Sequence, residues 1–177
     1  MKHRGFPSVF ISALVFAFAP MDAARADIPW VWNYSGTGVT ASGTLWTTES
    51  PDAAGFYQIT SISGSRNGDT ITGLYPTGSA IPGNEPYVVD NLIRTSGPGQ
   101  TTVEGFGYSL ASGAYANPYY ADFLSPPSYS EVFTQAATFN EIPVSFHASP
   151  VPEPASFALL LSGLLLLTVR RRKDFAP

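Results

Sequence analysis

Residues 55–74 read GFYQITSISGSRNGDTITGL, and this stretch decides the fold class. Polar and apolar residues alternate on both sides of Asn67-Gly68, as in strands that bury one face. An Asn-Gly pair between two such runs is the strongest short-range hairpin signal, because a type I′ turn needs positive φ at both central residues. The stretch therefore predicts two antiparallel strands, over 56–63 and 69–74, joined by a tight turn.

Similar short runs recur on both sides of this hairpin, separated by Gly and Pro, and no long helical period interrupts them. They predict further strands over 30–35, 40–46, 87–93, 101–110, 119–123, 131–139 and 142–147. Spacing of this kind indicates an all-β domain, either an antiparallel β-sandwich or a flattened barrel. The expected core residues are Trp30, Trp46, Phe56, Ile59, Ile62, Ile71, Leu74, Val89, Ile93, Phe106, Phe123, Phe133, Phe139 and Val144.

The two ends of the chain read as addressing segments and are set apart from the fold. Lys2, His3 and Arg4 precede an apolar run that ends near the small-x-small site Ala24-Arg25-Ala26. A basic start, a short apolar run and an Ala-x-Ala site are the three parts of a secretory signal peptide. We therefore expect residues 1–26 to be a signal peptide that signal peptidase cleaves after Ala26, with Ala24 and Ala26 as the recognition residues.

The C-terminal segment has three parts in a fixed order. Val151-Pro152-Glu153-Pro154 is followed by an apolar run to Val169 and then by Arg170-Arg171-Arg172-Lys173. The apolar run predicts a short transmembrane helix. Residues 155–169 would span roughly 22 Å at about 1.5 Å per residue, so the crossing needs arginine snorkelling and local bilayer thinning. The basic cluster predicts a cytoplasmic end, which leaves everything up to residue 150 outside the cytoplasm.

This tail resembles the PEP-CTERM sorting signal, over about 27 residues. The resemblance implies that a membrane-embedded exosortase cuts near Pro152-Glu153-Pro154, with Val151 and Arg170–Arg172 completing the signal. It implies export, transient anchoring in the inner membrane, and a final place at the envelope surface or outside the cell. The hosts of this family often make exopolysaccharide. A plain tail anchor that is never cut is the alternative.

The expected division is a signal peptide at 1–26, an extracytoplasmic β-rich domain at 27–150 and the sorting signal at 151–177. The middle domain resembles a recurrent PEP-CTERM ectodomain in the stretch Gly55–Gly64, in Asn67-Gly68, in Ile71-Thr72-Gly73-Leu74 and in Asp90-Asn91. That resemblance implies an all-β fold and no particular activity.

Charge excludes one class of partner. Residues 27–150 contain two basic residues, Arg66 and Arg94, against ten acidic ones, a formal net charge of −8. Such a surface repels phosphate backbones, so nucleic acid is not expected as a partner. The chain has no cysteine, which excludes disulfides and thiolate metal sites.

Catalytic and cofactor motifs are missing from the middle domain. It contains one histidine, His147, and no Gly-x-Ser-x-Gly motif, so neither histidine-based catalysis nor a serine nucleophile is expected. No cofactor is expected. Calcium is the one ion that the turn residues suit, because it takes loop carboxylate and carbonyl oxygens. These residues are Asn67, Asp69, Asn84, Glu85, Asp90 and Asn91.

The function expected from the sequence is that of a non-enzymatic surface or extracellular-matrix protein, associated with exopolysaccharide or a biofilm. Two alternatives stay open. Tyr115, Tyr119 and Tyr120 lie in a Tyr-rich stretch and would form a carbohydrate-binding surface if their rings were exposed. They would instead be half-buried strand residues if the stretch packs. A secreted glycoside hydrolase is the other alternative, because ten acidic residues allow a carboxylate pair.

Overall fold

A computed structural model describes residues 27–152, and over this range the chain is entirely β, with no helix. None of the described residues belongs to a helix with the length and apolar character needed to cross a membrane. The signal peptide and the apolar tail that the sequence predicts lie outside the described residues. The strands are β1 (Ile28–Gly36), β2 (Val39–Thr47), β3 (Tyr57–Arg66), β4 (Asp69–Leu74), β5 (Leu92–Ile93), β6 (Tyr108–Leu110), β7 (Tyr115–Ala121), β8 (Ser128–Gln135) and β9 (Thr138–Pro150).

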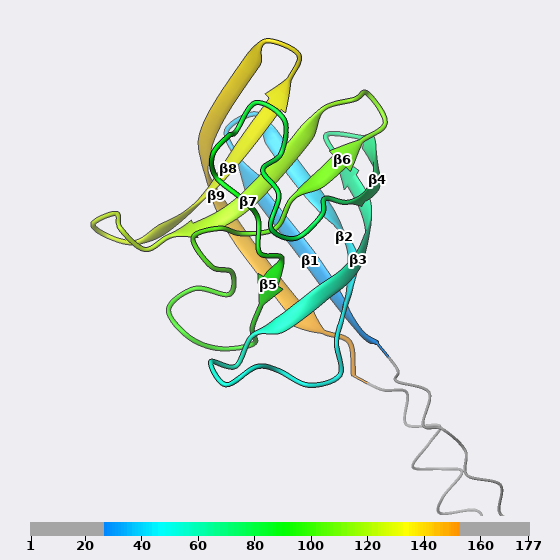
Figure 1. Ribbon diagram of the computed structural model, residues 1–177, viewed down its shortest axis with the longest axis vertical. Helices are drawn as coiled ribbons and strands as arrows, with labels where there is room; N and C mark the ends of the chain where they lie inside the picture. The colour runs from blue at the N-terminus through cyan, green and yellow to red at the C-terminus, as the bar shows by residue number, and fades with distance from the viewer. Residues whose placement is uncertain (1–26, 153–177) are drawn as a thin grey trace, which may run out of the picture.

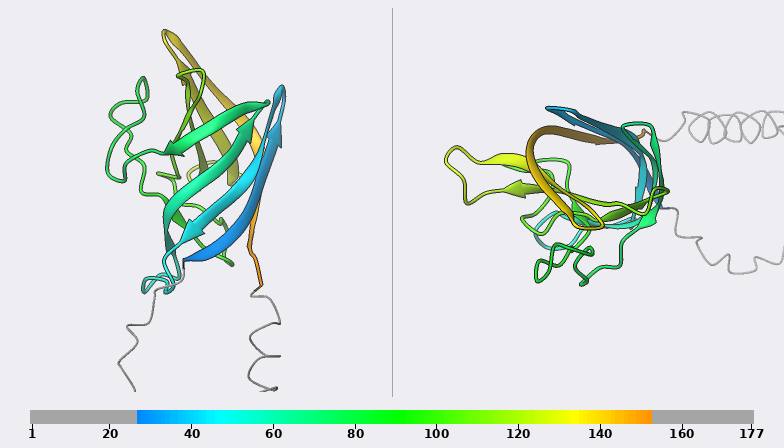
Figure 2. Two further views of the ribbon diagram at one scale, coloured as in Figure 1. Left: turned by 90° about the vertical axis from the view of Figure 1, so that its right-hand side faces the viewer. Right: turned by 90° about the horizontal axis from the view of Figure 1, so that it is seen from above.

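The strands close into an antiparallel barrel. Strands β1 to β4 pair in chain order, β4 then pairs with β6, and β6 to β9 again pair in chain order. The ring closes because β9 pairs with β1 over Trp30↔Pro150 to Gly36↔Val144. The short contact of β5 with β3 lies outside this ring. Figure 2 shows the closed ring from above and the steep tilt of its strands from the side. Of the two predicted architectures, the chain forms the barrel.

The predicted hairpin over 55–74 is confirmed. Asn67 and Gly68 have φ of 48° and 83°, the positive values that a type I′ turn requires. Asn67 also joins this turn to the neighbouring β1–β2 turn, since its Nδ2 donates to the Gly38 carbonyl (2.9 Å) and its Oδ1 accepts from the Thr40 amide (2.8 Å). The turn residue thus links two hairpins at one end of the barrel.

The barrel interior is filled by side chains from alternate positions on the strands, as the period of two dictates. On β1 the inward residues Trp30, Trp32 and Tyr34 are all buried. Trp32 stacks on Tyr34 and meets the edge of Phe106. Large aromatic rings therefore occupy the centre, where a small eight-stranded barrel has room only for side chains.

A long segment between β4 and β6 runs along the outside of the barrel (Figure 1), although its Ile93 and Phe106 belong to the interior core. Its Ile81 and Val89 are fully buried and form a second core with Tyr119, Ala121 and Val132 of β7 and β8. The outer face of β7 and β8 is therefore covered in part by residues 75–107, which we call the covering loop. This second layer creates the walls of the groove described below.

Several predicted strands and core positions need correction. Residues 87–93 and 101–110 are mostly irregular and contribute only β5, β6 and isolated bridges, because they belong to the covering loop. The predicted strand over 131–139 is interrupted by a turn at Ala136, whose φ is 51°. Phe123 and Phe139, both expected in the core, are 67% and 52% exposed.

The other core predictions divide into two groups. Seven of the predicted residues are buried: Trp30, Ile59, Ile62, Ile71, Val89, Ile93 and Phe106. Five are only half-buried: Trp46, Phe56, Leu74, Phe133 and Val144. The register shift between β2 and β3 at Trp46/Thr47 explains why Ile59 and Ile62, three residues apart, both face inward.

Candidate functional site

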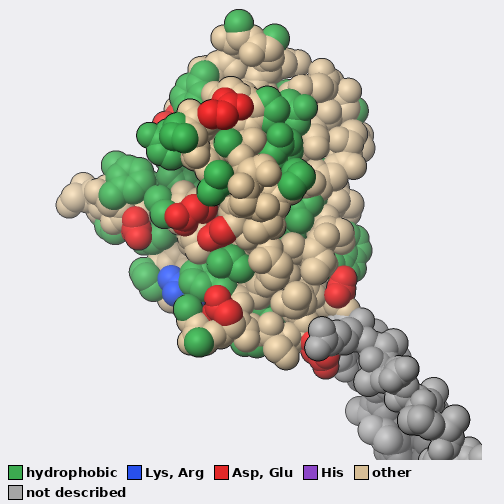
Figure 3. Space-filling view, in the orientation of Figure 1, with side chains coloured by type: hydrophobic (Ala, Val, Ile, Leu, Met, Phe, Trp, Pro, Cys, Tyr) green, Lys and Arg blue, Asp and Glu red, His purple; other side chains and the backbone are tan. Residues whose placement is uncertain are grey.

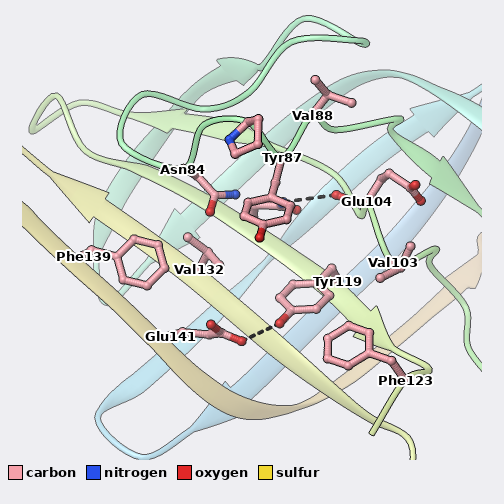
Figure 4. Close-up of a pocket in the computed structure, with 12 residues that line it drawn as sticks. Asn84, Tyr87, Val88, Val103, Glu104, Tyr119, Phe123, Val132, Phe139 and Glu141 are labelled. Atoms are coloured by element: carbon pink, nitrogen blue, oxygen red, sulfur yellow. Dashed lines mark hydrogen bonds between the residues drawn. The ribbon is translucent and has the colours of Figure 1, made fainter.

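A hollow lies on the outer face of β7, β8 and β9, beside the covering loop. We call it the outer groove; its volume is about 520 Å³, inside the range of roughly 300 to 1,000 Å³ typical of ligand pockets. Figure 4 shows side chains entering it from the covering loop and from the three strands. They are Asn84, Pro86, Tyr87, Val88, Val103, Glu104, Asn117, Tyr119, Phe123, Val132, Phe139 and Glu141.

The floor of the outer groove follows from strand register. Asn117 of β7 pairs with Val132 of β8, and Val132 pairs with Glu141 of β9. Residues in one register row point to the same face of a sheet, so these three side chains stand side by side on the outer face. The row places an amide, an aliphatic group and a carboxylate across the groove.

Tyr119 joins this floor two residues along β7. Its hydroxyl donates a hydrogen bond to Glu141 Oε1 (2.5 Å), and Figure 4 shows the two side chains pointing toward each other. Burial of the phenol raises the pKa of Tyr119 to about 12, and the hydrogen bond to the Glu141 carboxylate adds to the shift. Tyr119 is therefore a neutral donor at physiological pH and holds one carboxylate oxygen in place.

Exposed hydrophobic side chains border the outer groove. Tyr87 of the covering loop is 70% exposed, and Phe123 and Phe139 come from the β7–β8 connection and from the start of β9. Figure 4 shows Phe139 on one side of the Tyr119–Glu141 pair and Phe123 on the other. Three aromatic rings from three separate segments thus converge on one hollow.

The outer groove is acidic. Glu104 and Glu141 line it, and on the face in Figure 3 acidic side chains lie among hydrophobic ones. Both arginines of residues 27–152 are used elsewhere. Arg66 pairs with Glu131 inside the barrel, and Arg94 lies over the Phe56 ring and donates to the Gly99 carbonyl. Nothing among the described residues gives the groove a positive charge.

Asp90 lies close to this acidic wall. Burial raises the pKa of Asp90 to about 6; hydrogen bonds from Thr102 and the Leu92 amide oppose the shift, and the charge of Glu104 adds to it. Asp90 therefore keeps its proton to a higher pH than a fully solvated aspartic acid does.

The three tyrosines predicted to stack on sugars have different surroundings. Tyr119 is in the outer groove. Tyr115 packs edge-on against Tyr75 of the covering loop, and Tyr120 lies against Tyr129 and over Gly99. Because β7 sends successive side chains to opposite faces, adjacent Tyr119 and Tyr120 cannot share one surface. The Tyr-rich stretch therefore contributes one residue to the groove.

The turn residues considered for calcium do not gather in one place. Asn67 links two hairpins, and Asn91 is fully buried and hydrogen-bonded to Tyr75, Thr77 and Gly107. Glu85 accepts from the Gly83 amide. Among residues 27–152, no group of three or more His, Cys, Asp or Glu side chains is placed to hold a metal ion. Asn84 is the one candidate of this set that lines the outer groove.

The sorting-signal residues lie only in part within the structure. Val151 and Pro152 are described, and the Val151 amide donates to the Pro29 carbonyl of β1 (2.8 Å). Glu153, Pro154, Arg170, Arg171 and Arg172 lie outside the described residues, as do Ala24 and Ala26. The last backbone hydrogen bond of the described barrel therefore comes one residue before Pro152.

Sequence reasoning missed Tyr87, Phe123, Phe139 and Glu141 as groove residues. A signal for two of them was available in β9, where Ile142, Val144, Phe146 and Ala148 form one apolar face. Extending the alternation backward places Phe139 and Glu141 on the opposite, outward face. The positions of Tyr87 and Phe123 depend on irregular loops and had no comparable signal.

Comparison with known proteins identifies the C-terminal segment. Residues 150–173 match the family model described as the PEP-CTERM protein-sorting motif. No curated protein and no solved structure matches the chain.

Proposed function

The chain carries the sorting motif of PEP-CTERM proteins, and from this premise we propose that it is an exported protein, processed by exosortase, that acts without catalysis at the cell surface or in the extracellular matrix. The family resemblance associates such a role with exopolysaccharide. Signal peptidase, the secretion machinery and exosortase are the partners of maturation, with transient anchoring in the inner membrane.

The observation that carries the proposal is the position of the sorting motif relative to the barrel. β9 pairs with β1 up to Pro150, and the bond from the Val151 amide to the Pro29 carbonyl follows. Within the described range, every strand and both cores lie before Pro152. A cut near Pro152-Glu153-Pro154 would thus remove the tail without removing any of these barrel contacts.

The two ends of the barrel wall support the same proposal. β1 begins and β9 ends side by side at one end of the barrel (Figure 1). The predicted signal-peptidase site after Ala26 and the predicted exosortase site near Pro152 would therefore be neighbours. Phe139 is 11 residues before Pro150 on β9, which is about 35 Å along the strand at roughly 3.3 Å per residue. The part of the outer groove around Phe139 would then lie well away from the membrane during processing.

The test is the intact mass of the protein from its host, with and without a working exosortase. We expect a species that lacks 1–26 and the residues after Pro-Glu-Pro only when exosortase is present. Surplus mass on that species would identify an attached group. A species that keeps residues 155–177 in both strains would contradict processing and make the protein a permanent tail-anchored one.

Matrix association is tested separately, by fractionating cells, envelope and matrix of both strains. The proposal predicts that the processed protein is enriched in the surface or matrix fraction. Uniform release into the medium, with no association, would contradict this part.

A further inference from the structure

We propose that the outer groove is a saccharide-binding site for sugars that carry no acidic group. The inference deepens the proposed surface or matrix function, on which its biological role rests, by naming a site and a ligand class. Three properties of the groove support it: its exposed rings, its polar floor and its charge.

The exposed rings are the first property. Tyr87, Phe123 and Phe139 each leave half or more of their surface in water although they come from different segments. Soluble proteins rarely gather large apolar side chains on one exposed patch unless that patch binds something. The flat faces of aromatic rings match the C–H faces of pyranose rings. Rings on both sides of the Tyr119–Glu141 pair (Figure 4) suit an oligosaccharide lying across the strands.

The polar floor is the second property and distinguishes a sugar from a purely apolar ligand. Asn117 is 4% exposed and donates from Nδ2 to the Glu104 carbonyl (3.1 Å), but its Oδ1 has no hydrogen-bond partner among the described residues. A buried carbonyl oxygen without a donor costs free energy. Because Oδ1 has less than 1 Å² of accessible surface, no ligand contacts it in this geometry. The polar contacts open to a sugar come from the Glu141 carboxylate and from Asn84, which line the groove.

The charge of the outer groove selects among sugars. Two glutamates line it and neither arginine of the described range reaches it. Uronic acids, sulfated sugars and phosphate groups would meet like charge there, which is unfavourable. Neutral hexoses, N-acetylated hexosamines and amino sugars meet no such penalty. The groove therefore favours a neutral or amino-sugar polysaccharide.

Calorimetry on the processed protein purified from its host tests this inference. The probes are oligosaccharides of glucose, galactose and N-acetylglucosamine, chitosan oligomers, polygalacturonate oligomers, and the host's own exopolysaccharide. We expect binding to at least one neutral or amino-sugar probe and none to polygalacturonate. Tyr87→Ala and Phe139→Ala should each weaken binding about tenfold, as for central contact residues.

Val31→Ala is the matched control, because Val31 is an exposed hydrophobic residue on β1 away from the groove. It should leave the affinity unchanged. All three variants change exposed side chains and should keep the thermal midpoint of the native protein, so a lost affinity will not reflect unfolding.

Three outcomes would overturn the inference: no binding to any neutral or amino-sugar probe, equal binding of polygalacturonate, or equal affinities in all variants. If Tyr87→Ala instead lowers the oligomeric mass without any sugar binding, the groove is a self-association face and the inference also fails. These results are independent of the intact-mass test, so processing and binding can fail separately. Cleavage of a bound oligosaccharide would support the site but contradict the non-catalytic function, and would make Glu104 and Glu141 the residues to test.

Discussion

Arg66 and Glu131 form a two-point ion pair inside the barrel, with Arg66 Nε on Oε1 at 2.7 Å and an Arg66 terminal nitrogen on Oε2 at 2.9 Å. The Glu131 side chain is fully buried, and it also accepts the Tyr34 hydroxyl, which in turn bonds the Tyr108 hydroxyl. Burial raises the pKa of both tyrosines, so they stay neutral. The guanidinium also lies 3.9 Å from the centre of the Phe133 ring. A charged network is thus enclosed in an otherwise hydrophobic core.

Replacing Glu131 by glutamine should strongly destabilise the protein. The change leaves the Arg66 cation buried without a counter-charge, and breaking such a pair costs about 3–5 kcal/mol. Equilibrium urea unfolding measures the loss. Adding Arg66→Met in the same chain removes the unpaired cation and should recover a large part of it, since the new amide at position 131 still offers an oxygen to Tyr34. A double variant no more stable than the single one would show that the tyrosine hydrogen bonds, and not the arginine, carry the effect.

The Asn91 side chain holds the two ends of the covering loop together, and two substitutions separate its two roles. Its side chain bonds the Tyr75 carbonyl, the Thr77 hydroxyl and the Gly107 amide, at a φ of 55°. Asn91→Gly keeps the backbone conformation but leaves the buried Gly107 amide unpaired, a cost of about 1–3 kcal/mol. Asn91→Ala should lose about 1 kcal/mol more, because alanine is strained at positive φ.

Hydrogen exchange measured across residues 75–107 tests whether the Asn91 side chain holds the covering loop in place. Both variants should speed exchange there and leave β1 and β2 unchanged. Equal stability of the Gly and Ala variants would mean that the left-handed backbone at position 91 contributes nothing.

The parts of the fold that the sequence predicted are those governed by local rules. The 55–74 hairpin follows from alternation and from the φ preference of Asn-Gly, and both are properties of a few adjacent residues. The β8–β9 turn was missed because Ala136 holds a positive φ that alanine rarely adopts, so the sequence carries no turn signal there. Closure through β1 and β9 involves residues more than a hundred positions apart, and alternation alone is compatible with a sandwich.

The outer groove was predictable only in fragments. Tyr119 was named from the Tyr-rich stretch, while Tyr120 was named with it although the pleat sends it to the other face. Phe123 and Phe139 were assigned to the core on hydrophobicity alone. Alternation along β9 separates Phe139 from the core, whereas the exposure of Phe123 depends on the irregular β7–β8 connection, for which the sequence has no comparable signal.

Gly43 should tolerate no side chain, whereas Gly73 should. Gly43 faces Gly64 across the β2–β3 ladder, and a Cβ on Gly43 would overlap the Ser63 carbonyl oxygen. Backbone cannot yield as a side chain can, so Gly43→Ala should destabilise by more than about 2 kcal/mol or prevent folding. Gly73→Ala in β4 meets nothing within 4 Å and should change the stability by less than about 1 kcal/mol. Thermal melts of both variants measure this difference in stability. Equal melting points would refute a close approach of β2 and β3.

The contribution of Asp90 to stability should fall as the pH rises from about 4 to about 7. Burial places the folded pKa of Asp90 at about 6, above the ordinary value of 3.8. The folded state therefore holds this proton more tightly than the unfolded chain does. The resulting stabilisation is complete below the ordinary value and is lost as the pH passes through about 6.

Asp90→Asn is the matched variant, because its side-chain oxygen can still accept from the Leu92 amide but cannot ionise. The melting temperature of the variant minus that of the native protein should grow from pH 4 to pH 7. Glu104→Gln removes a neighbouring charge that raises the pKa of Asp90. In this variant the loss of stability with rising pH should therefore end at a lower pH and be smaller in total. The reason is that less repulsion lets the folded state carry the Asp90 charge at a lower cost. A difference between native and Asp90→Asn proteins that stays constant from pH 4 to pH 7 would show that Asp90 titrates alike in the folded and unfolded chains.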